Sequence, residues 1–411
     1  MVKKIKACRI CNKEALVQFL PLGRIPLPNG FIEHKNLKKI EARYPLNVAL
    51  CTHCGLVQLL DIVDPEEMFH NYVYIPSTSK TRMNNFAEIA SQARQRFAVT
   101  TDSLVIDIGS NDGSLLSFFK GHGIKTLGID PAENLAKIAE LKGIETVNDY
   151  VSARLARKLR KAKGGAKVIT ATNVVAHIKD LHDLLSAVEI LLADDGVFIC
   201  EFPYLLDLIQ NNQFDTIYHE HLSYFSIKPL LNLLSQVELE CIDIERTAID
   251  GGSLRVFLAK KKNKRPLNSK IAAMQKAEFV YGLGSIETFN SFADRVRKIR
   301  TDLHTTLADL KSKGKTIAAY GAAAKGNILL NYCKIGNRLI DFIADSTPYK
   351  QGLYTPGTHI PIYPESEILG RMPDYILITA WNFAKEIKDK EKKYTAQGGK
   401  FIIPVPAVTI L

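Results

Sequence analysis

Two histidines, a carboxylate and a tyrosine stand side by side within DTIYHEHLSYFS, residues 215–226. They are Tyr218, His219, Glu220 and His221. Imidazole can remove a proton near neutral pH, a carboxylate can orient it, and a phenol can donate a hydrogen bond to a developing oxyanion. The same residue types could also hold a metal ion or form a crowded polar turn. In an extended strand Tyr218 and Glu220 would face one side and the histidines the other, whereas a turn would break that separation.

Four of the seven cysteines form two C-x-x-C pairs, CRIC and CTHC, in the first 54 residues. The four are Cys8, Cys11, Cys51 and Cys54. Two such pairs can direct four thiolates at one ion, which is the closed tetrahedral arrangement of structural zinc. A thioredoxin-like redox pair is the alternative, but no βαβ pattern precedes either pair. We therefore predict a zinc site that holds the N-terminal region together.

A strand, a glycine turn and a helix are predicted for VIDIGSNDGSLL, residues 105–116. Gly109 and Gly113 would let a ligand approach the backbone at the carboxyl end of the strand. The spacing departs from G-x-G-x-x-G, so a dinucleotide is less favoured. The next strand, TLGID, ends in Asp130, where an acid can hydrogen-bond a ribose diol. Together these features predict a nucleoside-binding site.

The elements that must position these residues alternate between strand and helix. The apolar segments SLVIDIG, KTLGID, AKVITATN and GVFICEFP predict a parallel sheet covered by helices. Helical sequence is expected over residues 80–98 and 268–313, and a second α/β series runs from KTIAAYGAAAKGN to KFIIPVP. We predict an α/β protein with domains at residues 1–75, 76–262 and 263–411.

The second series opens with AAYGAAAKGN, residues 318–327, whose spacing is G-x-x-x-x-G. The inner glycine of a dinucleotide site is missing. A helix N-terminus with Lys325 beside it suits a pyrophosphate. Lys350 and His359, in the polar loop after the next strand, are further candidates for substrate contact. The alternative is a duplicated fold that serves packing alone.

Composition places the chain among globular proteins, with 411 residues, 46% hydrophobic and 24% charged. No apolar run reaches the roughly 18 residues that span a bilayer, and MVKKIKACRI lacks the apolar segment of a secretory signal. We therefore expect a cytoplasmic protein without a membrane partner, and a monomer because the chain supplies all its domains. The net charge of +11 is consistent either with lysine-rich surfaces or with an anionic ligand.

The sequence VIDIGSNDGSLL resembles motif I of the class I S-adenosylmethionine (SAM)-dependent methyltransferases. The cysteine pairs, this motif, NVVAHI, YHEHLSYFS and YGAAAKGNILLNY follow one another as in the nucleotide-sugar C-methyltransferases, and this resemblance covers the whole chain. It implies a zinc-binding N-terminal domain, a central class I methyltransferase domain and a C-terminal Rossmann-like domain. The implied reaction of branched-sugar biosynthesis adds a methyl group, through an enolate, to the carbon beside the ketone of a nucleoside-diphosphate 4-keto-6-deoxysugar. We expect C3 as the acceptor, with C5 as the other option.

The resemblance also assigns roles to individual residues. The general base falls on His221, and its companions in catalysis are Tyr218, Glu220, His177 and Tyr72. Cofactor contacts fall on Asp107, Gly109, Asn111, Gly113, Asp130 and Asn173. The segment PSTS, with Ser77 and Ser79, is expected to close over the cofactor. The C-terminal domain, with Lys325, Lys350 and His359, is expected to help hold the sugar nucleotide.

Two other functions compete with this interpretation. An O- or N-methyltransferase would need a base but no group to stabilise an enolate. A zinc-containing nucleic-acid-binding protein would fit the positive charge, but no basic helix with interleaved aromatics is present, so we expect no nucleic-acid partner. A metal site at His219, Glu220 and His221 is disfavoured because the cysteines already account for a metal. His219 is expected to be structural.

Overall fold

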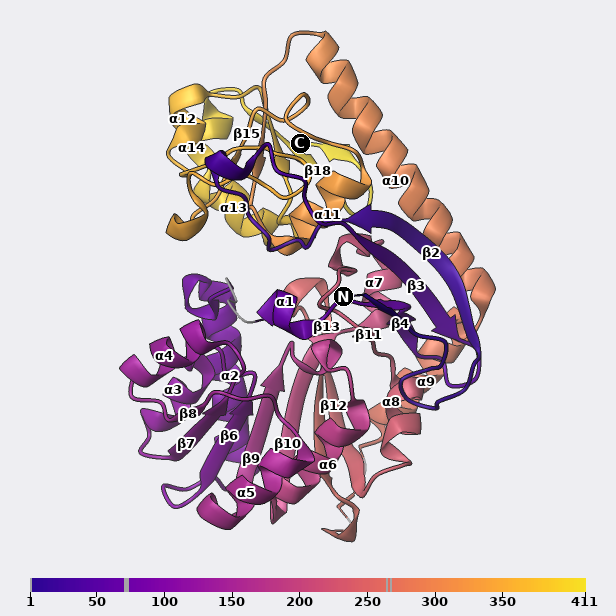
Figure 1. The fold of residues 1–411 in the computed structure, drawn as a ribbon, viewed down its shortest axis with the longest axis vertical. Coiled ribbons are helices and arrows are strands. Elements are labelled where there is room, and N and C mark those ends of the chain that lie inside the picture. Colours follow the sequence, from indigo (N-terminus) through magenta and orange to yellow (C-terminus); the bar gives the residue numbers. More distant parts are fainter. Residues whose placement is uncertain (1, 70–73, 264, 267) are drawn as a thin grey trace.

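The structure is a computed structural model that describes residues 2–69, 74–263, 265–266 and 268–411. It shows the expected α/β fold, with a four-stranded, a seven-stranded and a six-stranded sheet as its main layers. In Figure 1 the C-terminal unit lies above the central unit, and the N-terminal strands run beside both. Within the described residues, no helix has both the length and the apolar character required to cross a bilayer.

The N-terminal unit is an antiparallel sheet in the order β11-β4-β3-β2. Its elements and the short segments beside it are β1 (Lys3–Lys4), β2 (Leu16–Ile25), β3 (Tyr44–Cys51), β4 (Val57–Leu59), β5 (Asp61–Ile62) and α1 (Pro65–Phe69). The fourth strand, β11 (Ser223–Tyr224), follows the YHEH sequence and pairs with β4, Ser223 opposite Gln58 and Tyr224 opposite Val57. The N-terminal sheet is therefore completed by a segment of the central unit.

The central unit is a seven-stranded sheet in the order β12-β13-β10-β9-β6-β7-β8, parallel except for β13. Its strands are β6 (Leu104–Ile108), β7 (Lys125–Ile129), β8 (Thr146–Val147), β9 (Ala166–Thr172), β10 (Leu192–Pro203), β12 (Leu239–Thr247) and β13 (Ser253–Lys260). All of β6 and residues 196–202 of β10 are buried, as in strands that are covered on both faces. The direction of connection reverses between β6 and β9, so the carboxyl ends of these two strands form the crevice where α/β sheets bind ligands.

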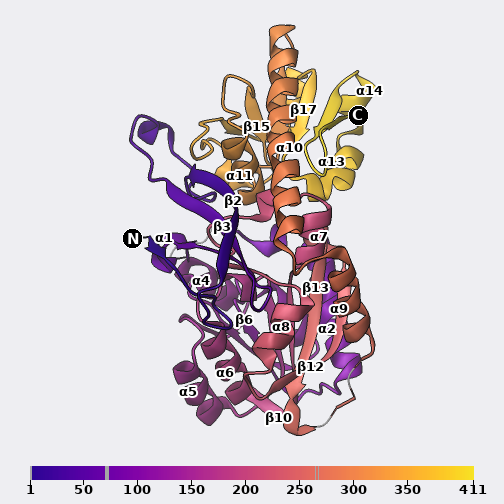
Figure 2. The ribbon, with the colours of Figure 1, turned by 90° about the vertical axis from the view of Figure 1, so that its right-hand side faces the viewer.

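Helices cover both faces of this sheet, as the side view in Figure 2 shows. They are α2 (Lys80–Arg96), α3 (Ser114–Lys120), α4 (Glu133–Leu141), α5 (Ala153–Lys163), α6 (Leu181–Leu191), α7 (Leu205–Gln210) and α8 (Ile227–Leu234). The helix α2 contributes Phe86 and Ile89 to a core with Leu116 and Phe119 of α3. Ser79 caps α2 by accepting a hydrogen bond from the backbone N of Arg82 at 3.3 Å.

The C-terminal unit is a six-stranded sheet in the order β16-β15-β14-β17-β18-β19, parallel except for β19. Its strands are β14 (Ile317–Tyr320), β15 (Phe342–Ala344), β16 (Ile362–Tyr363), β17 (Tyr375–Ile378), β18 (Lys400–Ile403) and β19 (Thr409–Ile410). Its helices are α11 (Ala324–Tyr332), α12 (Glu367–Arg371), α13 (Ala384–Lys390) and α14 (Lys392–Ala396). The unit thus repeats the strand–turn–helix arrangement of the central sheet.

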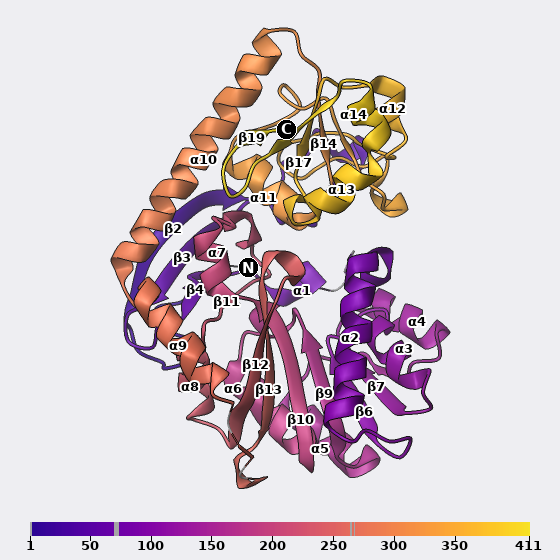
Figure 3. The ribbon, with the colours of Figure 1, turned by 180° about the vertical axis from the view of Figure 1, so that it is seen from behind.

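The helical stretch expected at 268–313 is two helices, α9 (Lys270–Tyr281) and α10 (Ile286–Ser312). Gly282 adopts φ 90° after α9, a conformation that ends a helix and favours glycine. The long α10 then runs beside β2 from the central to the C-terminal unit, as Figures 1 and 3 both show. Phe19 of β2 packs on Phe289 of α10 with ring centroids 4.9 Å apart. One hydrophobic core joins all three units in this way.

Candidate active site

The four cysteines of the two C-x-x-C pairs meet at one point. Their sulfur atoms all lie within 4.8 Å of one another, with Cys8 and Cys54 3.5 Å apart and Cys11 and Cys51 3.6 Å apart. Zinc–sulfur bonds of about 2.3 Å in a tetrahedron require sulfur atoms about 3.8 Å apart, so the group fits zinc. It is also the one cluster of potential metal ligands found in the part of the chain that the structure describes, and His219, Glu220 and His221 form none.

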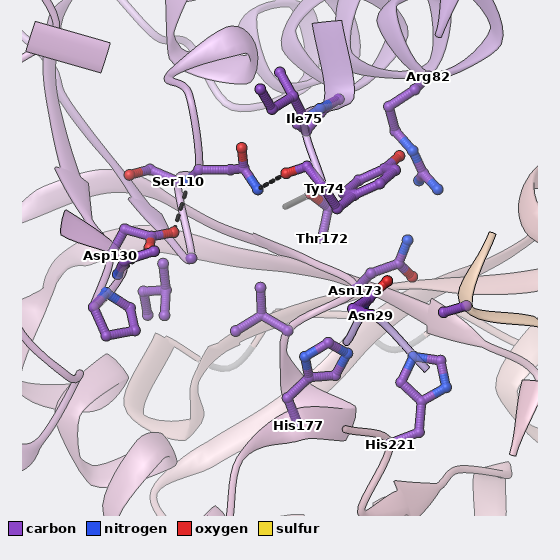
Figure 4. Close-up of a pocket in the computed structure, with 18 of the residues that line it drawn as sticks. Asn29, Tyr74, Ile75, Arg82, Ser110, Asp130, Thr172, Asn173, His177 and His221 are labelled. Atoms are coloured by element: carbon purple, nitrogen blue, oxygen red, sulfur yellow. Dashed lines mark hydrogen bonds between the residues drawn. The ribbon is translucent and has the colours of Figure 1, made fainter. Parts of the chain in front are cut away.

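A cavity of about 480 Å³ lies where the three units meet. It is lined by the carboxyl ends of β6, β7 and β9, by five residues of the segment 74–82, by Tyr218 and His221, and by loops of the C-terminal unit. Figure 4 shows Asp130 and Ser110 at one end of it and His177 and His221 at the other. Most of the residues that the sequence singled out therefore converge on one site.

The glycine turn after β6 shapes the first end of this cavity. Gly109 adopts φ 68°, and a side chain there would clash with Val174. The carboxylate of Asp130 accepts hydrogen bonds from the backbone N of Asn111 and of Ala132, both at 2.8 Å. Burial raises the pKa of Asp107 to about 7 although Thr170 donates a hydrogen bond to it at 2.6 Å. This end offers backbone groups and an acid to a nucleoside.

Three predicted cofactor residues lie beside the cavity and do not line it. Gly113 precedes α3 with φ 74° and packs against Ile144, so its role is to fit the turn. The hydroxyl of Ser77 is hydrogen-bonded to Asp112, and Ser79 caps α2. Pro76 and Thr78 of the same segment do line the cavity, so the segment covers the cofactor turn with other residues than the two serines.

An ion-pair network that the sequence analysis did not predict forms part of the cavity wall. Asp250, at φ 58° between β12 and β13, binds Nη2 of Arg82 with both carboxylate oxygens at 2.5 and 2.6 Å. It also accepts a hydrogen bond from Nδ2 of Asn173 at 2.8 Å, and its carbonyl accepts one from Nζ of Lys325 at 3.1 Å. Burial alone would raise the pKa of Asp250, but the Arg82 and Lys325 charges lower it to about 2.

This network leaves one donor and one acceptor without protein partners. Oδ1 of Asn173 and Nη1 of Arg82 are buried without a partner at hydrogen-bond distance, although the Arg82 guanidinium also interacts with the hydroxyl of Tyr74. Both residues line the cavity. A buried polar atom without a partner is costly, so a ligand that carries a carboxylate and an ammonium group would stabilise this end. The amino-acid portion of SAM has both groups.

The YHEH sequence forms a turn, which decides between the two arrangements that the sequence left open. The backbone N of His221 donates to the carbonyl of Tyr218 at 2.9 Å, and the two rings stack with centroids 4.0 Å apart. The ring of His177 lies 4.9 Å from that of His221. Tyr218, His221 and His177 therefore all line the same cavity, and Figure 4 shows the two histidines side by side.

The protonation states in this group are fixed by burial. Nδ1 of His221 contacts the carbonyl of Thr216 at 2.8 Å, so Nδ1 carries the proton and the lone pair lies on Nε2. Burial, with a further contribution from the Lys325 charge, lowers the pKa of His221 to about 4 despite the Thr216 contact. Burial also lowers the pKa of His177 and raises that of Tyr218 well above 10. At neutral pH the site holds a neutral imidazole as acceptor and a phenol as donor.

Glu220 and His219, the other residues of the YHEH turn, do not line the cavity. Glu220 is buried and accepts a hydrogen bond from Nδ2 of Asn29 at 2.7 Å, while Thr216 orients His221. His219 points away from the cavity to the carbonyl of Tyr44 at 3.3 Å, as expected of a structural residue. Tyr72 lies outside the described residues.

Lys325 and Lys350 bring positive charge to the C-terminal wall of the cavity. Both are buried, which lowers the pKa of each lysine. Nζ of Lys325 lies 5.2 Å from the ring centre of Trp381, and Nζ of Lys350 donates to the carbonyl of Ala322 at 3.0 Å. The prediction for His359 is not met by its position, since it is outside the cavity lining and its ring contacts Glu41.

Among the cavity residues that the sequence did not single out are Asn29, Arg82 and Asp250. Each had a weak signal. Asn29 lies in a P-N-G turn, Arg82 follows the PSTS segment by three positions, and Asp250 precedes two glycines. Such signals mark unusual backbone but do not say which distant residues it meets.

Three family descriptions match the chain in order. They are "Putative zinc binding domain" over residues 8–69, "Methyltransferase domain" over residues 82–244 and "C-methyltransferase C-terminal domain" over residues 248–406. The curated C-methyltransferase NovU of Streptomyces niveus is 35% identical over 411 residues, which is 100% of this chain and 98% of NovU.

Solved structures resemble the chain over less than half of its length. A SAM-dependent methyltransferase of Anabaena variabilis is 12% identical over 47% of this chain and 98% of its own, with a TM-score of 0.36. The PH0226 protein of Pyrococcus horikoshii is 14% identical over 48% of this chain and 99% of its own, with a TM-score of 0.37.

Proposed function

Because this chain belongs to the family of SAM-dependent, zinc-binding C-methyltransferases, we propose that its acceptor is a nucleoside-diphosphate 4-keto-6-deoxysugar. The methyl group would go to a ring carbon beside the ketone, with C3 the first position to test and C5 the second. The observation that carries the proposal is His221, a buried imidazole whose Nε2 faces a cavity shared with the cofactor turn.

Carbon is a poor nucleophile until a proton is removed from it, and this is the work of His221. Thr216 fixes the ring through Nδ1, so Nε2 is available to take the proton from the carbon beside the ketone. An imidazole with a pKa of about 4 is a weak base. The diphosphate of a bound substrate would add negative charge to the cavity and raise that pKa toward neutrality.

The proton loss leaves an enolate whose oxygen needs a hydrogen-bond donor. Tyr218 suits this role because its phenol stays protonated and its ring stacks on that of His221. His177, neutral and in ring contact with His221, is a second candidate. SAM, when bound, supplies a methyl group that is already activated on a sulfonium.

Different parts of the cavity wall would hold SAM and the sugar nucleotide next to each other. At one end Asp130, the Gly109 turn and the unpaired atoms of Arg82 and Asn173 suit the nucleoside and amino-acid portions of SAM. Lys325 and Lys350, on the C-terminal wall next to this network, suit a diphosphate. Holding both partners in one cavity removes much of the entropic cost of bringing them together.

The decisive experiment follows the substrate by NMR in heavy water, with purified enzyme, SAM and a 4-keto-6-deoxysugar nucleotide. We expect one α-proton to exchange and a methyl group to appear on the same carbon, which identifies C3 or C5. His221→Asn should lose both events, by roughly 1,000-fold, because the base is missing. Binding of SAM should stay within about 3-fold of wild type.

Two results would contradict the proposal. If wild type exchanges no proton and methylates no keto sugar nucleotide, the acceptor is another compound. If His221→Asn still exchanges the proton at the wild-type rate, another residue is the base. Transfer to a sugar oxygen or an amine would return the reaction to the O- or N-methyl class.

A further inference from the structure

The N-terminal unit contributes a loop to the cavity wall, and nothing in the family assignment gives this loop a role. Residues 27–31, LPNGF, turn back on themselves, with the backbone N of Gly30 donating to the carbonyl of Leu27 at 3.1 Å. Asn29, at the tip, lines the cavity that also contains His221 and Tyr218. Figure 4 shows it in the same group as the two histidines.

Both other units hold this loop in place. On the C-terminal side, Nδ2 of the buried Asn327 of α11 donates to the carbonyl of Pro28 at 2.6 Å. Nζ of Lys350 lies 5.3 Å from the ring centre of Phe31. On the central side, Nδ2 of Asn29 donates to the carboxylate of Glu220 at 2.7 Å. The loop is therefore a preorganised part of the site.

The contact with Glu220 fixes which way the amide of Asn29 points. A carboxylate only accepts hydrogen bonds, so Nδ2 must face Glu220 and Oδ1 must face away from it. The one side-chain hydrogen bond of Asn29 in the described structure is that to Glu220. Oδ1 remains as an acceptor at the cavity wall.

On the basis of the proposed function, we infer that Asn29 recognises a hydroxyl group next to the reacting carbon of the sugar, and that Glu220 positions Asn29. A carbonyl oxygen attracts hydroxyl donors and repels ketone and phosphate oxygens, so Asn29 cannot serve those parts of the substrate. Glu220 immediately precedes His221 in the turn. The group that Asn29 meets must therefore lie close to the carbon that His221 deprotonates.

This assignment gives Glu220 a role different from orienting the base. Thr216 already orients His221, while Glu220 reaches the loop of another unit. Oδ1 of Asn29, held in one direction by the buried carboxylate of Glu220, should discriminate well between substrates. A substrate without the hydroxyl would leave this oxygen unpaired.

The test compares two substrates in wild type and variants. The substrates are thymidine-diphosphate 4-keto-6-deoxyglucose and its 2-deoxy counterpart, which lacks the hydroxyl beside C3. For Asn29→Ala we expect KM for the first sugar to rise about 10-fold, the value of one hydrogen bond, with kcat and the Kd of SAM little changed. The 2-deoxy sugar should show little difference between wild type and variant.

Glu220→Gln should raise the same KM, and it should add nothing to Asn29→Ala in the double variant, because the two residues act as one unit. Arg43→Ala is the matched control. It removes another contact between the N-terminal and C-terminal units, the 3.3 Å hydrogen bond to the carbonyl of Gly357, but lies outside the cavity lining. It should leave the ratio of the two KM values unchanged.

The inference is overturned if Asn29→Ala leaves both KM values unchanged or raises them equally, since a purely structural contact would not sense one hydroxyl. Calorimetric binding of unreactive thymidine-diphosphate glucose separates this failure from a failure of the proposed function. If wild type neither binds nor methylates sugar nucleotides, both fall. If wild type does and Asn29→Ala matches it, only the role of Asn29 falls.

Discussion

The central and C-terminal sheets build the same turn from different residues. After β6, the carboxylate of Asp130 at the end of β7 accepts a hydrogen bond from the backbone N of Asn111 at 2.8 Å. After β14, the carboxylate of Asp345 at the end of β15 accepts one from the backbone N of Ala322 at 2.7 Å. In each unit an acid on the second strand braces the turn that follows the first.

The two turns differ in what they present to the cavity. In the central unit the backbone of Gly109 and Asn111 lines the cavity directly. In the C-terminal unit Lys350 donates to the carbonyl of Ala322, and Lys325 lies in the first turn of α11. The turn after β6, which has no lysine beside it, therefore suits a nucleoside. The turn after β14, with Lys325 and Lys350 beside it, suits an anion.

Loss of the zinc should disturb the central turn and the C-terminal turn together, because the N-terminal sheet contacts both units. The N-terminal sheet is completed by β11, which follows the YHEH turn, and the loop at residues 27–31 contacts α11. Cys51→Ser should lose the bound zinc, lower the melting temperature and abolish methyl transfer. Metal content by atomic absorption, thermal unfolding and activity would be measured together. A zinc-free protein with wild-type activity would show that the central unit supports its own site.

A matched pair of glycine substitutions should separate the two turns. Gly109→Ala places a side chain against Val174 at φ 68°, and should weaken SAM binding by roughly 100-fold. Gly321→Ala places one 2.8 Å from Cβ of Ala380 at φ 99°, and should raise KM for the sugar nucleotide while SAM binding stays within about 3-fold. Calorimetry and initial rates would measure both. Equal loss of SAM binding in both variants would contradict the division of roles.

Replacement of Lys325 should weaken binding of the sugar nucleotide more than binding of SAM. Lys325→Met removes a buried ammonium, so KM for the sugar nucleotide should rise about 10-fold or more, with little change in the Kd of SAM. Lys350→Met should act in the same direction. Titration of thymidine diphosphate against each variant gives the affinity without catalysis. Unchanged affinity in both variants would remove the diphosphate from this wall.

The smallest expected effect is electrostatic and links the two units. His221 is neutral, and able to act as a base, above its pKa of about 4, so kcat/KM should fall only as the pH drops well below 6.5. The Lys325 charge contributes to that low pKa. Lys325→Met should therefore move the acid limb of kcat/KM upward, by less than about one pH unit. The absence of a shift would place the lysine too far from the base to act on it, and a downward shift would contradict the sign of its effect.

The sequence predicted the parts of the molecule that depend on local patterns. The strands around Gly109, the two C-x-x-C pairs and the lysine of the second turn are each encoded within a dozen residues, and the structure shows them in place. The contacts that local patterns cannot encode were missed. Arg82 and Asp250 are 168 positions apart, and Asn29 and Glu220 are 191 apart.

The position of His359 shows the same limit from the other side. Its loop does follow the second strand of the C-terminal unit, and Lys350 of that loop reaches the cavity. The ring of His359 instead contacts Glu41, a residue of the N-terminal hairpin that the sequence gave no reason to place there. The direction of this side chain depends on a partner more than 300 positions away, which a local pattern cannot encode.

The pairing of β4 with β11 also limits when the N-terminal sheet can finish folding during synthesis. A ribosome releases β4 some 160 residues before β11, so in the growing chain β4 has an open edge with unpaired backbone groups. The contact of Pro28 with Asn327 forms later still, 299 positions along the chain. The first unit to be synthesised is thus among the last to be completed. Chains truncated before β11 would carry the four zinc-binding cysteines in a sheet whose β4 edge is unpaired and prone to aggregation.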